Sequence, residues 1–150
     1  MHRIMFVCLG NICRSPMAEC VLKQLVAQRG LSESFIIDSA ATCGDEIGNP
    51  IHHGTRRKLK EMGVPICEHR AVQLRRTDYN RYDLFLCMDG GNLADLRRIF
   101  GSDPQHKIKR LLDYSARPRD IADPWYTGNF DVTYDDIFEG CTALLEALSD

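Results

Sequence analysis

The sequence predicts an α/β protein, a three-layer sandwich in which a four-stranded, Rossmann-like parallel sheet lies between helices on both faces. Short apolar runs alternate along the chain with longer amphipathic stretches, which is typical of parallel strands joined by helices. The 150 residues are enough to bury one hydrophobic core. Because no repeat or low-complexity linker divides the chain, we expect residues 1–150 to form a single domain.

The first half of the chain should contribute two strands and two helices. Residues 3–7 form a short apolar strand, and a helix follows that begins at Ser15 as its N-cap and ends at Gly30. Residues 34–38 are the second strand. A glycine-containing loop then leads to a helix over residues 51–62.

The second half of the chain continues the alternation. A short helical segment is expected over residues 74–80, a strand over 83–87, a helix over 92–100 and a fourth strand over 107–112. The last helix begins near Asp131, and apolar residues recur along it at steps of three and four, which predicts a stripe that faces the core. The stripe consists of Tyr134, Ile137, Phe138, Cys141, Leu144, Leu145 and Leu148.

Composition argues against several classes of function. The formal net charge of −2 gives no reason to expect nucleic acid or a membrane as a partner. The apolar run after Arg3 is too short for a signal peptide, and the 7 cysteines are irregularly spaced, so we expect reduced thiols and a cytoplasmic location. Histidines and cysteines do not occur at zinc-ligand spacing, so we expect no metal ion and no other cofactor.

The loop after the first strand has the features of an anion-binding site. It runs from Cys8 to Arg14 and contains Gly10 and Asn11, the residue types that tolerate positive φ most easily. Such a loop can turn several backbone N–H groups toward one point, and the dipole of the following helix adds positive potential. The fork of donors on Arg14 matches two phosphate oxygens. We therefore expect a phosphate to bind between Cys8 at the floor of the loop and Arg14 at its rim.

The same surroundings should make Cys8 a nucleophile. Converging N–H groups and a guanidinium favour the thiolate over the thiol, and we expect the Ser15 hydroxyl to donate to the sulfur. Displacement of an alkoxide or aryloxide from phosphate also needs a proton donor. Asp123 is the best candidate, since Pro124 fixes the direction of the chain beside it. An ordinary turn is the alternative for this dipeptide, as it is for residues 103–104.

Two motifs resemble those of a known family. The run C-L-G-N-I-C-R-S-P, residues 8–16, resembles the signature loop of the low-molecular-weight protein tyrosine phosphatases, and D-P-W-Y, residues 123–126, resembles their general-acid loop. The resemblance covers nearly the whole chain and implies the phosphotyrosine phosphatase I type of fold. It implies metal-independent hydrolysis of phosphotyrosine through a cysteinyl phosphate on Cys8, with Arg14 binding phosphate and Asp123 as general acid and base. The implied phosphate-binding loop consists of Leu9, Gly10, Asn11, Ile12, Cys13 and Ser15.

The resemblance also implies residues around this loop. Hydrogen-bonded side chains should hold the loop in its shape, namely Asn11, Ser15, Ser39 and His69. Two carboxylates are candidates to orient Arg14, with stabilisation of a helix end as the alternative; they are Glu19 and Asp89. Walls of a substrate pocket are expected from Leu9, Ile12, Asp45, Glu46, Trp125 and Tyr126.

Departures from the family pattern bear on specificity. Many relatives have an aromatic residue where this sequence has Asp45, so with Glu46 beside it the pocket should disfavour acidic peptides. Ile12 is β-branched and should pack a flat phenol ring better than a non-planar group, which favours phosphotyrosine over phosphoarginine. In the family, a thiol at the position of Cys13 pairs reversibly with the nucleophile Cys8, and a passive thiol is the alternative. The other five cysteines are interpreted as structural.

Two other functions compete with a phosphatase. An arsenate reductase of the same fold would need a downstream cysteine pair, and Cys87 has no partner after it in the sequence. A non-catalytic oxyanion-binding or redox-sensing module would lack the nucleophile or the acid. For the phosphatase, the expected partners are tyrosine-phosphorylated proteins, among them an autophosphorylating tyrosine kinase if the source is bacterial. Inorganic phosphate and other oxyanions should compete with them.

Overall fold

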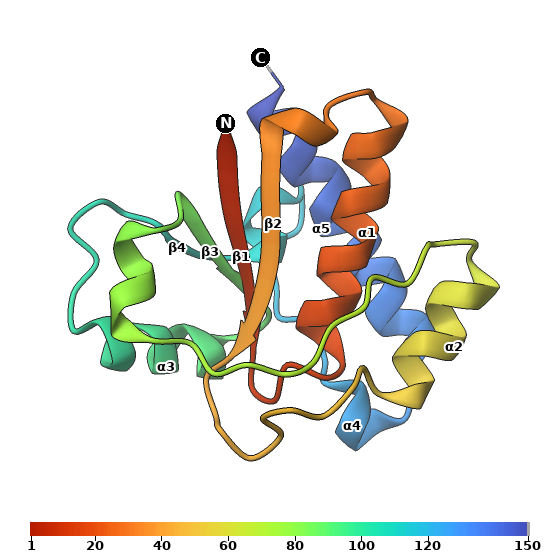
Figure 1. The fold of residues 1–150 in the computed structure, drawn as a ribbon, viewed down its shortest axis with the longest axis horizontal. Coiled ribbons are helices and arrows are strands. Elements are labelled where there is room, and N and C mark those ends of the chain that lie inside the picture. The colour runs from red at the N-terminus through yellow and green to blue at the C-terminus, as the bar shows by residue number, and fades with distance from the viewer. Residues whose placement is uncertain (150) are drawn as a thin grey trace.

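A computed structural model describes residues 1–149 and contains the predicted four-stranded parallel sheet, with its strands in the order β2-β1-β3-β4 (Figure 1). The strands are β1 (His2–Cys8), β2 (Phe35–Ala41), β3 (Leu84–Cys87) and β4 (Ile108–Arg110). The helices are α1 (Arg14–Gln28), α2 (His53–Glu61), α3 (Gly90–Phe100), α4 (Pro124–Thr127) and α5 (Phe130–Leu148). Three short 3-10 segments, η1 (Ser32–Ser34), η2 (Arg76–Asn80) and η3 (Leu111–Tyr114), complete the chain.

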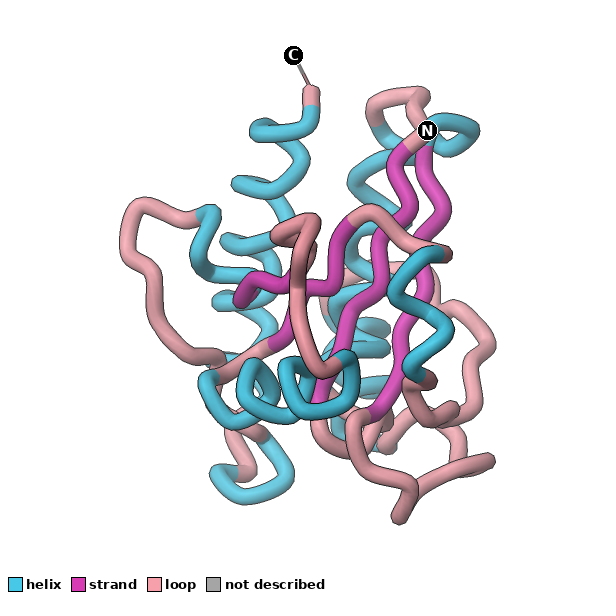
Figure 2. Tube along the Cα trace, turned by 90° about the vertical axis from the view of Figure 1, so that its left-hand side faces the viewer, coloured by secondary structure: helices cyan, strands magenta, loops and turns pink. Residues whose placement is uncertain are grey.

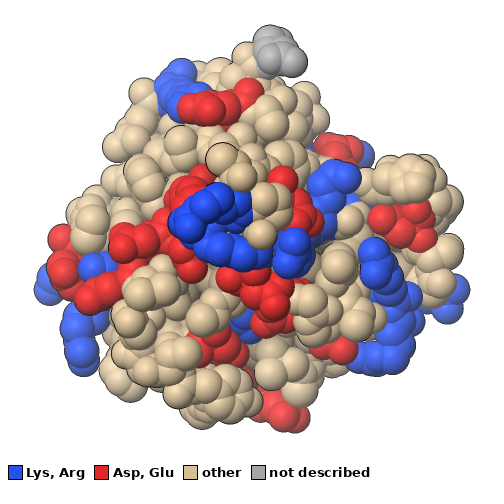
Figure 3. Space-filling view, turned by 180° about the vertical axis from the view of Figure 1, so that it is seen from behind, with Lys and Arg blue, Asp and Glu red and all other residues tan. Residues whose placement is uncertain are grey.

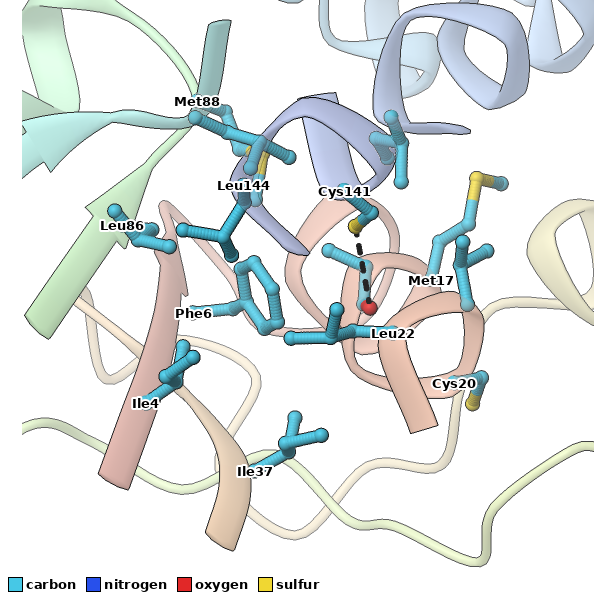
Figure 4. Close-up of a cluster of buried hydrophobic side chains, with 14 of the residues drawn as sticks. Ile4, Phe6, Met17, Cys20, Leu22, Ile37, Leu86, Met88, Cys141 and Leu144 are labelled. Carbon is cyan, nitrogen blue, oxygen red and sulfur yellow. Dashed lines mark hydrogen bonds between the residues drawn. The ribbon is translucent and has the colours of Figure 1, made fainter. Parts of the chain in front are cut away.

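The sheet lies between two helical layers, which confirms the predicted three-layer arrangement. Along β1, Ile4 and Phe6 belong to the core formed with α1 and α5, while Met5 and Val7 belong to the core formed with α3. This alternation follows from the two-residue period of a strand. Figure 1 shows α3 on one side of the strands and α1 and α5 on the other, and Figure 2 views the strands from the side of α3. Figure 4 shows Phe6 among the side chains of the α1 and α5 layer.

The carboxyl ends of the strands meet at one edge of the sheet, opposite the two chain termini (Figure 1). The loop after β1, the loop after β2 and the short helix α4 all lie at this edge. Ligands of open parallel sheets bind at this kind of edge, because the loops there gather residues from several strands. The fold therefore brings Cys8 and Asp123 together although 115 positions separate them.

Two strand ends differ from the sequence prediction by more than one residue. β2 extends to Ala41 instead of ending at 38, because its pairing with β1 continues to the Cys8–Ala41 register. β4 ends at Arg110, since the Asp113 carboxylate accepts the Arg110 N–H (2.9 Å) and turns the next residues into η3. Leu111 and Leu112 are buried there rather than in the sheet.

Two residue assignments on the helices were wrong. Ser15 is not the N-cap of α1, because the helix begins at Arg14 after Cys13, and the Ser15 hydroxyl bonds within the loop instead. Phe138 is 42% exposed and does not belong to the core stripe of α5. It lies one position beyond Ile137 and is therefore rotated about 100° from it around the helix. The other six members of the stripe are buried or packed against the core.

The expectation of uniformly reduced thiols was also wrong. Cys20 on α1 forms a disulfide with Cys67, which lies in the segment between α2 and η2. No sequence signal marked the pair, since 47 residues separate the two cysteines.

The surface carries charges of both signs. On the face shown in Figure 3, basic and acidic side chains lie next to one another, in keeping with ion pairs such as Arg119–Asp136 and Arg110–Asp120. Within residues 1–149, no helix has both the length and the apolar character that crossing a bilayer requires.

Candidate active site

The loop between β1 and α1 encloses the sulfur of Cys8. The backbone N–H groups of Asn11 and Ser15 point at this sulfur, with N–Sγ distances of 3.3 and 3.4 Å. The Ser15 hydroxyl lies 3.0 Å from it, so the hydrogen bond expected between these two side chains is present. Donors converging on one sulfur stabilise its negative charge, as they would that of an oxyanion. Cys8 is a free cysteine that is only 3% exposed.

Asn11 holds this loop in a left-handed turn. Its φ of 60° is unusual for a residue other than glycine, and its side chain is fully buried. The side-chain amide donates to Ser15 Oγ (2.7 Å) and Ser39 Oγ (3.0 Å). Its carbonyl oxygen accepts the Val72 N–H (3.1 Å) and contacts His69 Nε2 (2.6 Å). The predicted support residues therefore do lie together, and they determine a strained backbone position.

The network continues away from the loop to Glu19. Ser39 donates its hydroxyl to Glu19 Oε1 at 2.6 Å, and Lys23 pairs with the other carboxylate oxygen at 2.6 Å. Glu19 is thus occupied by Ser39 and Lys23 and does not orient Arg14. Burial lowers the pKa of His69 and nearby Lys23 acts in the same direction, whereas the charge of Glu19, 3.8 Å from Nδ1, opposes them. Asn11 Oδ1 can only accept, so His69 Nε2 is the donor in their 2.6 Å contact.

Arg14 is held by two other groups. One terminal nitrogen donates to Asp89 (2.7 Å) and to the Ile121 carbonyl (2.8 Å), and the other lies 3.3 Å from Asp123. Burial alone would lower the pKa of Arg14, but the negative charges of Cys8, Asp89 and Asp123 outweigh it, so its pKa is raised. Asp89 is therefore the carboxylate that orients Arg14. Its other oxygen caps α3 by accepting the Asn92 N–H (2.8 Å), so both roles considered for this residue are present.

Asp123 lies at the start of α4, across the cavity from the loop that contains Cys8. It is the N-cap of α4, where Oδ1 accepts the Trp125 N–H at 3.0 Å and Pro124 takes the first helical position. Its other oxygen is the one near Arg14. The Asp-Pro pair at residues 103–104 is far from this arrangement: Asp103 accepts hydrogen bonds from Tyr79 and Lys107 at a structural turn.

A cavity of about 230 Å³ opens between the loop and α4. Its floor is formed by Cys8 and Arg14, and the remaining lining residues are Leu9, Gly10, Ile12, Cys13, Cys43, Asp45, Glu46, Asp123, Trp125 and Tyr126. All of the expected pocket residues therefore line it. Trp125 and Tyr126 are exposed at its mouth, where they can contact the flat ring of a ligand.

Sequence reasoning missed an aromatic cluster beside this cavity. His52, which had no assigned role, stacks on Phe130 (centroids 5.5 Å apart) and meets Trp125 edge to face (5.6 Å). The His52 Nδ1 accepts the Gly54 N–H, and the backbone N–H of His52 donates to the Ile12 carbonyl (2.8 Å). The cluster links the phosphate-binding loop to α4. The sequence also gave no sign that Arg14 would donate to the Ile121 carbonyl or that Asn11 would accept the Val72 N–H, because any residue type can supply these main-chain atoms.

Two other thiols near the site, Cys13 and Cys87, have raised pKa values. Burial, followed by the negative charges of Cys8 and Asp123, raises the pKa of Cys13 to about 12. Burial raises the pKa of Cys87 to about 12 as well, and its thiol donates to the Asp89 carbonyl. Cys87 is a free cysteine, and the next cysteine in the sequence is Cys141, so no neighbouring thiol completes the pair that an arsenate reductase would need.

A larger hollow, of about 550 Å³, lies beside β2 and is lined by Asp38, Tyr82, Asp78 and Arg81 among others. It contains no cysteine, and its carboxylates pair with Tyr82 and Arg81. The chemistry of the smaller cavity makes it the candidate active site.

Fold and site together define a class of α/β protein in which a loop after the first strand binds a tetrahedral anion above a cysteine. Residues 3–150 match the family model described as "Low molecular weight phosphotyrosine protein phosphatase". The low molecular weight protein-tyrosine-phosphatase YfkJ of Bacillus subtilis is 41% identical over 99% of this chain and 96% of its own length. The human low molecular weight phosphotyrosine protein phosphatase is 41% identical over 95% of this chain and 93% of its own.

Solved structures agree with these sequence matches. The crystal structure of YfkJ superposes with a TM-score of 0.95 and covers 99% of this chain and 94% of that one. The structure of Vibrio vulnificus Wzb in complex with benzylphosphonate has a TM-score of 0.86 and 29% identity, and it covers 98% of this chain and 99% of that one. The chain belongs to the low molecular weight phosphotyrosine protein phosphatase family. It is an enzyme of the protein-tyrosine-phosphatase class, a phosphoric monoester hydrolase.

Proposed function

We propose that Cys8, Arg14 and Asp123 carry out the phosphatase reaction. In the first step the Cys8 thiolate attacks phosphorus in line with the leaving oxygen. The S–P bond forms, the P–O bond breaks, and the leaving phenol oxygen takes a proton from Asp123. Arg14 and the loop N–H groups stabilise the charge that spreads over the equatorial oxygens of phosphorus.

In the second step water hydrolyses the cysteinyl phosphate. The Asp123 carboxylate accepts a proton from the water, whose oxygen attacks phosphorus as the S–P bond breaks. Inorganic phosphate leaves, and the Ser15 hydroxyl donates to the sulfur as it regains its negative charge. Arg14 and the loop N–H groups supply the positive potential that stabilises the phosphoryl oxygens, and the proposed mechanism uses no metal ion.

The observation that carries this proposal is the convergence of donors on the Cys8 sulfur beneath Arg14 and Asp123. Two N–H groups and a hydroxyl lie within 3.4 Å of it. A buried structural cysteine needs no such donors, since it behaves as a small apolar residue.

Replacement of Asp123 by Asn tests the acid role. Asn can still accept the Trp125 N–H and cap α4, but it cannot donate the catalytic proton. Turnover of tyrosine phosphate should fall by roughly 10²–10⁴-fold, and turnover of p-nitrophenyl phosphate should fall less, because its more acidic phenol needs less help to leave. Wild-type activity should follow a bell-shaped pH profile on the acidic side of neutral.

Two controls separate this proposal from a loss of structure. Asp103→Asn changes the other Asp-Pro pair and should leave the preference between the two substrates as in the wild type. Cys8→Ser should abolish turnover of both substrates while circular dichroism stays unchanged. Equal losses of both substrates in Asp123→Asn would mean that Asp123 does not protonate the leaving group.

The proposed substrates are tyrosine-phosphorylated proteins. The exposed Trp125 and Tyr126 at the cavity and the benzylphosphonate bound by Wzb support a flat aromatic phosphate ester. Ile12 at the wall favours such an ester over phosphoarginine. Asp45 and Glu46 on the rim should disfavour acidic peptides. An autophosphorylating tyrosine kinase is the proposed partner, by analogy with the family, and capture by the Asp123→Ala variant tests it. Phosphate and other oxyanions should inhibit competitively.

We further propose that residues 1–150 act as one domain in the cytoplasm, where a reducing environment keeps the Cys8 nucleophile as a thiol. Cys8 and Cys13 both line the cavity, which supports a reversible disulfide between them. Peroxide would convert Cys8 to a sulfenic acid, and Cys13 would then condense with it and release water. Relative to its own starting activity, Cys13→Ser should recover less than the wild type after peroxide and then thiol treatment. Equal recovery would count against this disulfide.

A further inference from the structure

A second pair of cysteines lies next to the support network but outside the active-site cavity. Cys20 and Cys67 form a disulfide with their Cα atoms 5.7 Å apart. Cys20 is 1% exposed at the margin of the core cluster, away from Phe6, as Figure 4 shows. Cys67 is partly exposed and lies in a segment without regular secondary structure.

The disulfide joins the two chain segments that carry the far ends of the support network. Cys20 follows Glu19 directly, and Cys67 lies two residues before His69. Glu19 and His69 meet at Ser39, at distances of 2.6 and 3.3 Å from its hydroxyl. His69 also contacts the side-chain oxygen of Asn11 at 2.6 Å, and Asn11 lies in the loop that encloses Cys8. A shift of residue 67 would therefore be expected to move the His69 ring.

Side-chain contacts of Ile66, Cys67 and His69 hold residues 65–69, but the backbone of this segment makes few hydrogen bonds. Among the described residues, the backbone N–H of Cys67 bonds to Cys20 Sγ (3.3 Å), whereas no hydrogen bond is present for the N–H groups of residues 66, 68 and 69. Regular pairing resumes only at the bridge between Arg70 and Pro50. A segment with so few backbone hydrogen bonds has a low free energy of local opening, so a covalent link to α1 restricts it strongly.

Small redox reagents can reach the pair. A surface hollow of about 490 Å³ lies between α1 and this segment, and both cysteines line it together with Lys23, Gln24 and Ile66. The Lys23 ammonium at its wall can attract an incoming thiolate. Disulfides of intracellular proteins are usually transient or redox-sensing, which suits a bond that solvent can reach.

We propose that Cys20 and Cys67 are a second redox site, whose disulfide holds His69 against the phosphate-binding loop and so sets phosphatase activity; this inference rests on the proposed function. The co-reactant is a dithiol, of low molecular weight or on a protein. Its thiolate attacks Cys67 Sγ, the S–S bond breaks, and Cys20 leaves with the electron pair and takes a proton. The second thiol of the reductant then attacks the mixed disulfide and releases Cys67 as a thiol. Two electrons pass from the dithiol to the protein, and a low-molecular-weight disulfide reverses the exchange.

Peptide mapping tests the site itself. The enzyme is equilibrated in buffers of graded dithiol-to-disulfide ratio, quenched in acid, alkylated and cut with trypsin. Residues 15–23 and 61–70 each contain one cysteine of the pair and no other. They should appear as one cross-linked species under oxidising conditions and as two alkylated peptides under reducing ones. Failure to cross-link at any ratio would overturn the proposal.

Kinetics in the same buffers test the effect on activity. Phosphate present during equilibration protects Cys8. As the pair becomes reduced, wild-type kcat/KM should fall by roughly 2–10-fold, mostly in kcat, since positioning is lost rather than a reacting group. Cys67→Ser and Cys20→Ser should both show the reduced-state value and lack this transition. Any change at Cys8 and Cys13 is common to all three proteins, so the difference between them belongs to Cys20 and Cys67.

A third variant tests the route through His69. In His69→Asn, the pair should still cross-link, but its oxidation state should no longer change kcat/KM. A cross-link that forms while wild-type kcat/KM stays constant would also overturn the proposal. If instead no protein turns over phosphate esters in any buffer, the proposed function fails, whereas the mapping result for the disulfide still stands.

Discussion

The sulfur of Cys8 is surrounded by donors because one residue, Asn11, takes a left-handed backbone conformation. Its φ of 60° turns the loop so that its own N–H and that of Ser15 face the sulfur. The buried Asn11 side chain uses both its amide and its carbonyl oxygen to hold that turn. The arrangement of donors around the Cys8 sulfur thus depends on a side chain that does not line the cavity.

Replacing Asn11 separates its side chain from its backbone. Asn11→Gly keeps the left-handed turn without strain but loses four hydrogen bonds, so the free energy of unfolding should fall by about 2–4 kcal/mol. Asn11→Ala should lose about 1 kcal/mol more, because alanine is strained at this φ. Both variants should lose roughly 10²-fold in kcat/KM for p-nitrophenyl phosphate.

Urea unfolding and steady-state kinetics measure these two effects. Wild-type kcat/KM in Asn11→Gly would show that the network does not position the loop.

At the scale of single residues, the sequence located the residues proposed as catalytic, but it was less informative about the residues that support them. Cys8, Arg14 and Ser15 lie in one short motif, and the D-P-W-Y run located Asp123. By contrast, the role of Glu19 in orienting Arg14 was wrong, since its carboxylate pairs with Ser39 and Lys23. Only the fold determines which of two nearby carboxylates reaches a given guanidinium.

At the scale of elements, helix α2 and the start of α5 position the acid loop. Gly54 on α2 lies against the Phe130 ring so closely that a Cβ there would overlap the ring atoms. Phe130 in turn stacks on His52, whose ring meets Trp125 beside Asp123. The absence of a side chain at residue 54 therefore lets α2 pack close enough to place α4.

Gly54→Ala should disturb this packing. We expect a loss of about 1–3 kcal/mol in the free energy of unfolding from the overlap with Phe130. Tryptophan fluorescence should change as well, because Trp125 is the chain's one tryptophan. Turnover should fall, and the loss should be larger in kcat than in KM.

Gly90→Ala is the matched control. Gly90 begins α3 and a Cβ there would meet nothing within 4 Å, so stability should stay the same or rise by up to about 1 kcal/mol. Equal destabilisation by both substitutions would contradict the packing argument.

Element types were predicted better than element boundaries. Apolar runs located all four strands and hydrophobic periodicity located the long helices, but the small residues at the end of β2 gave no strand signal. The short helix α4 was not predicted, since four residues are too few to show a period. Phe138 follows the apolar spacing of α5 yet faces outward, because spacing alone does not fix the edge of a stripe.

At the scale of the whole molecule, stability should depend on pH through two partly buried histidines. Burial lowers the pKa values of His69 and His52 below the ordinary histidine value of 6.5. The folded state binds protons on these rings less tightly than the unfolded chain does. Unfolding therefore takes up protons as the pH falls below 6.5, and the free energy of unfolding decreases in that window.

Urea unfolding about one unit above and one unit below pH 6.5 checks this prediction. His69→Asn removes one of the two groups, so its stability should change less between the two pH values than that of the wild type. Carboxylates with lowered pKa values, such as Glu139 at about 2, contribute to the free energy of unfolding until the pH is much more acidic. They therefore do not affect the difference in stability between the two pH values. An unchanged pH dependence in His69→Asn would contradict the assignment.

The overall architecture followed from the alternation of strands and helices, whereas the cysteine chemistry did not. An odd number of cysteines without a pairing pattern indicated free thiols, yet the fold brings Cys20 and Cys67 into bonding distance. Proximity in space between residues far apart in sequence is the property that periodicity and motifs do not contain. The Asn11–Ser39–His69 network and the His52 cluster depend on it in the same way.

The central claim is that the Cys8 sulfur takes the phosphoryl group during turnover. Acid quenching of the enzyme within one turnover of p-nitrophenyl phosphate, followed by trypsin and mass spectrometry, detects this intermediate directly. We expect a phosphoryl group on Cys8 within the peptide of residues 4–14, and none in Cys8→Ser. A phosphoryl group on any other residue, or continued turnover by Cys8→Ser, would contradict it.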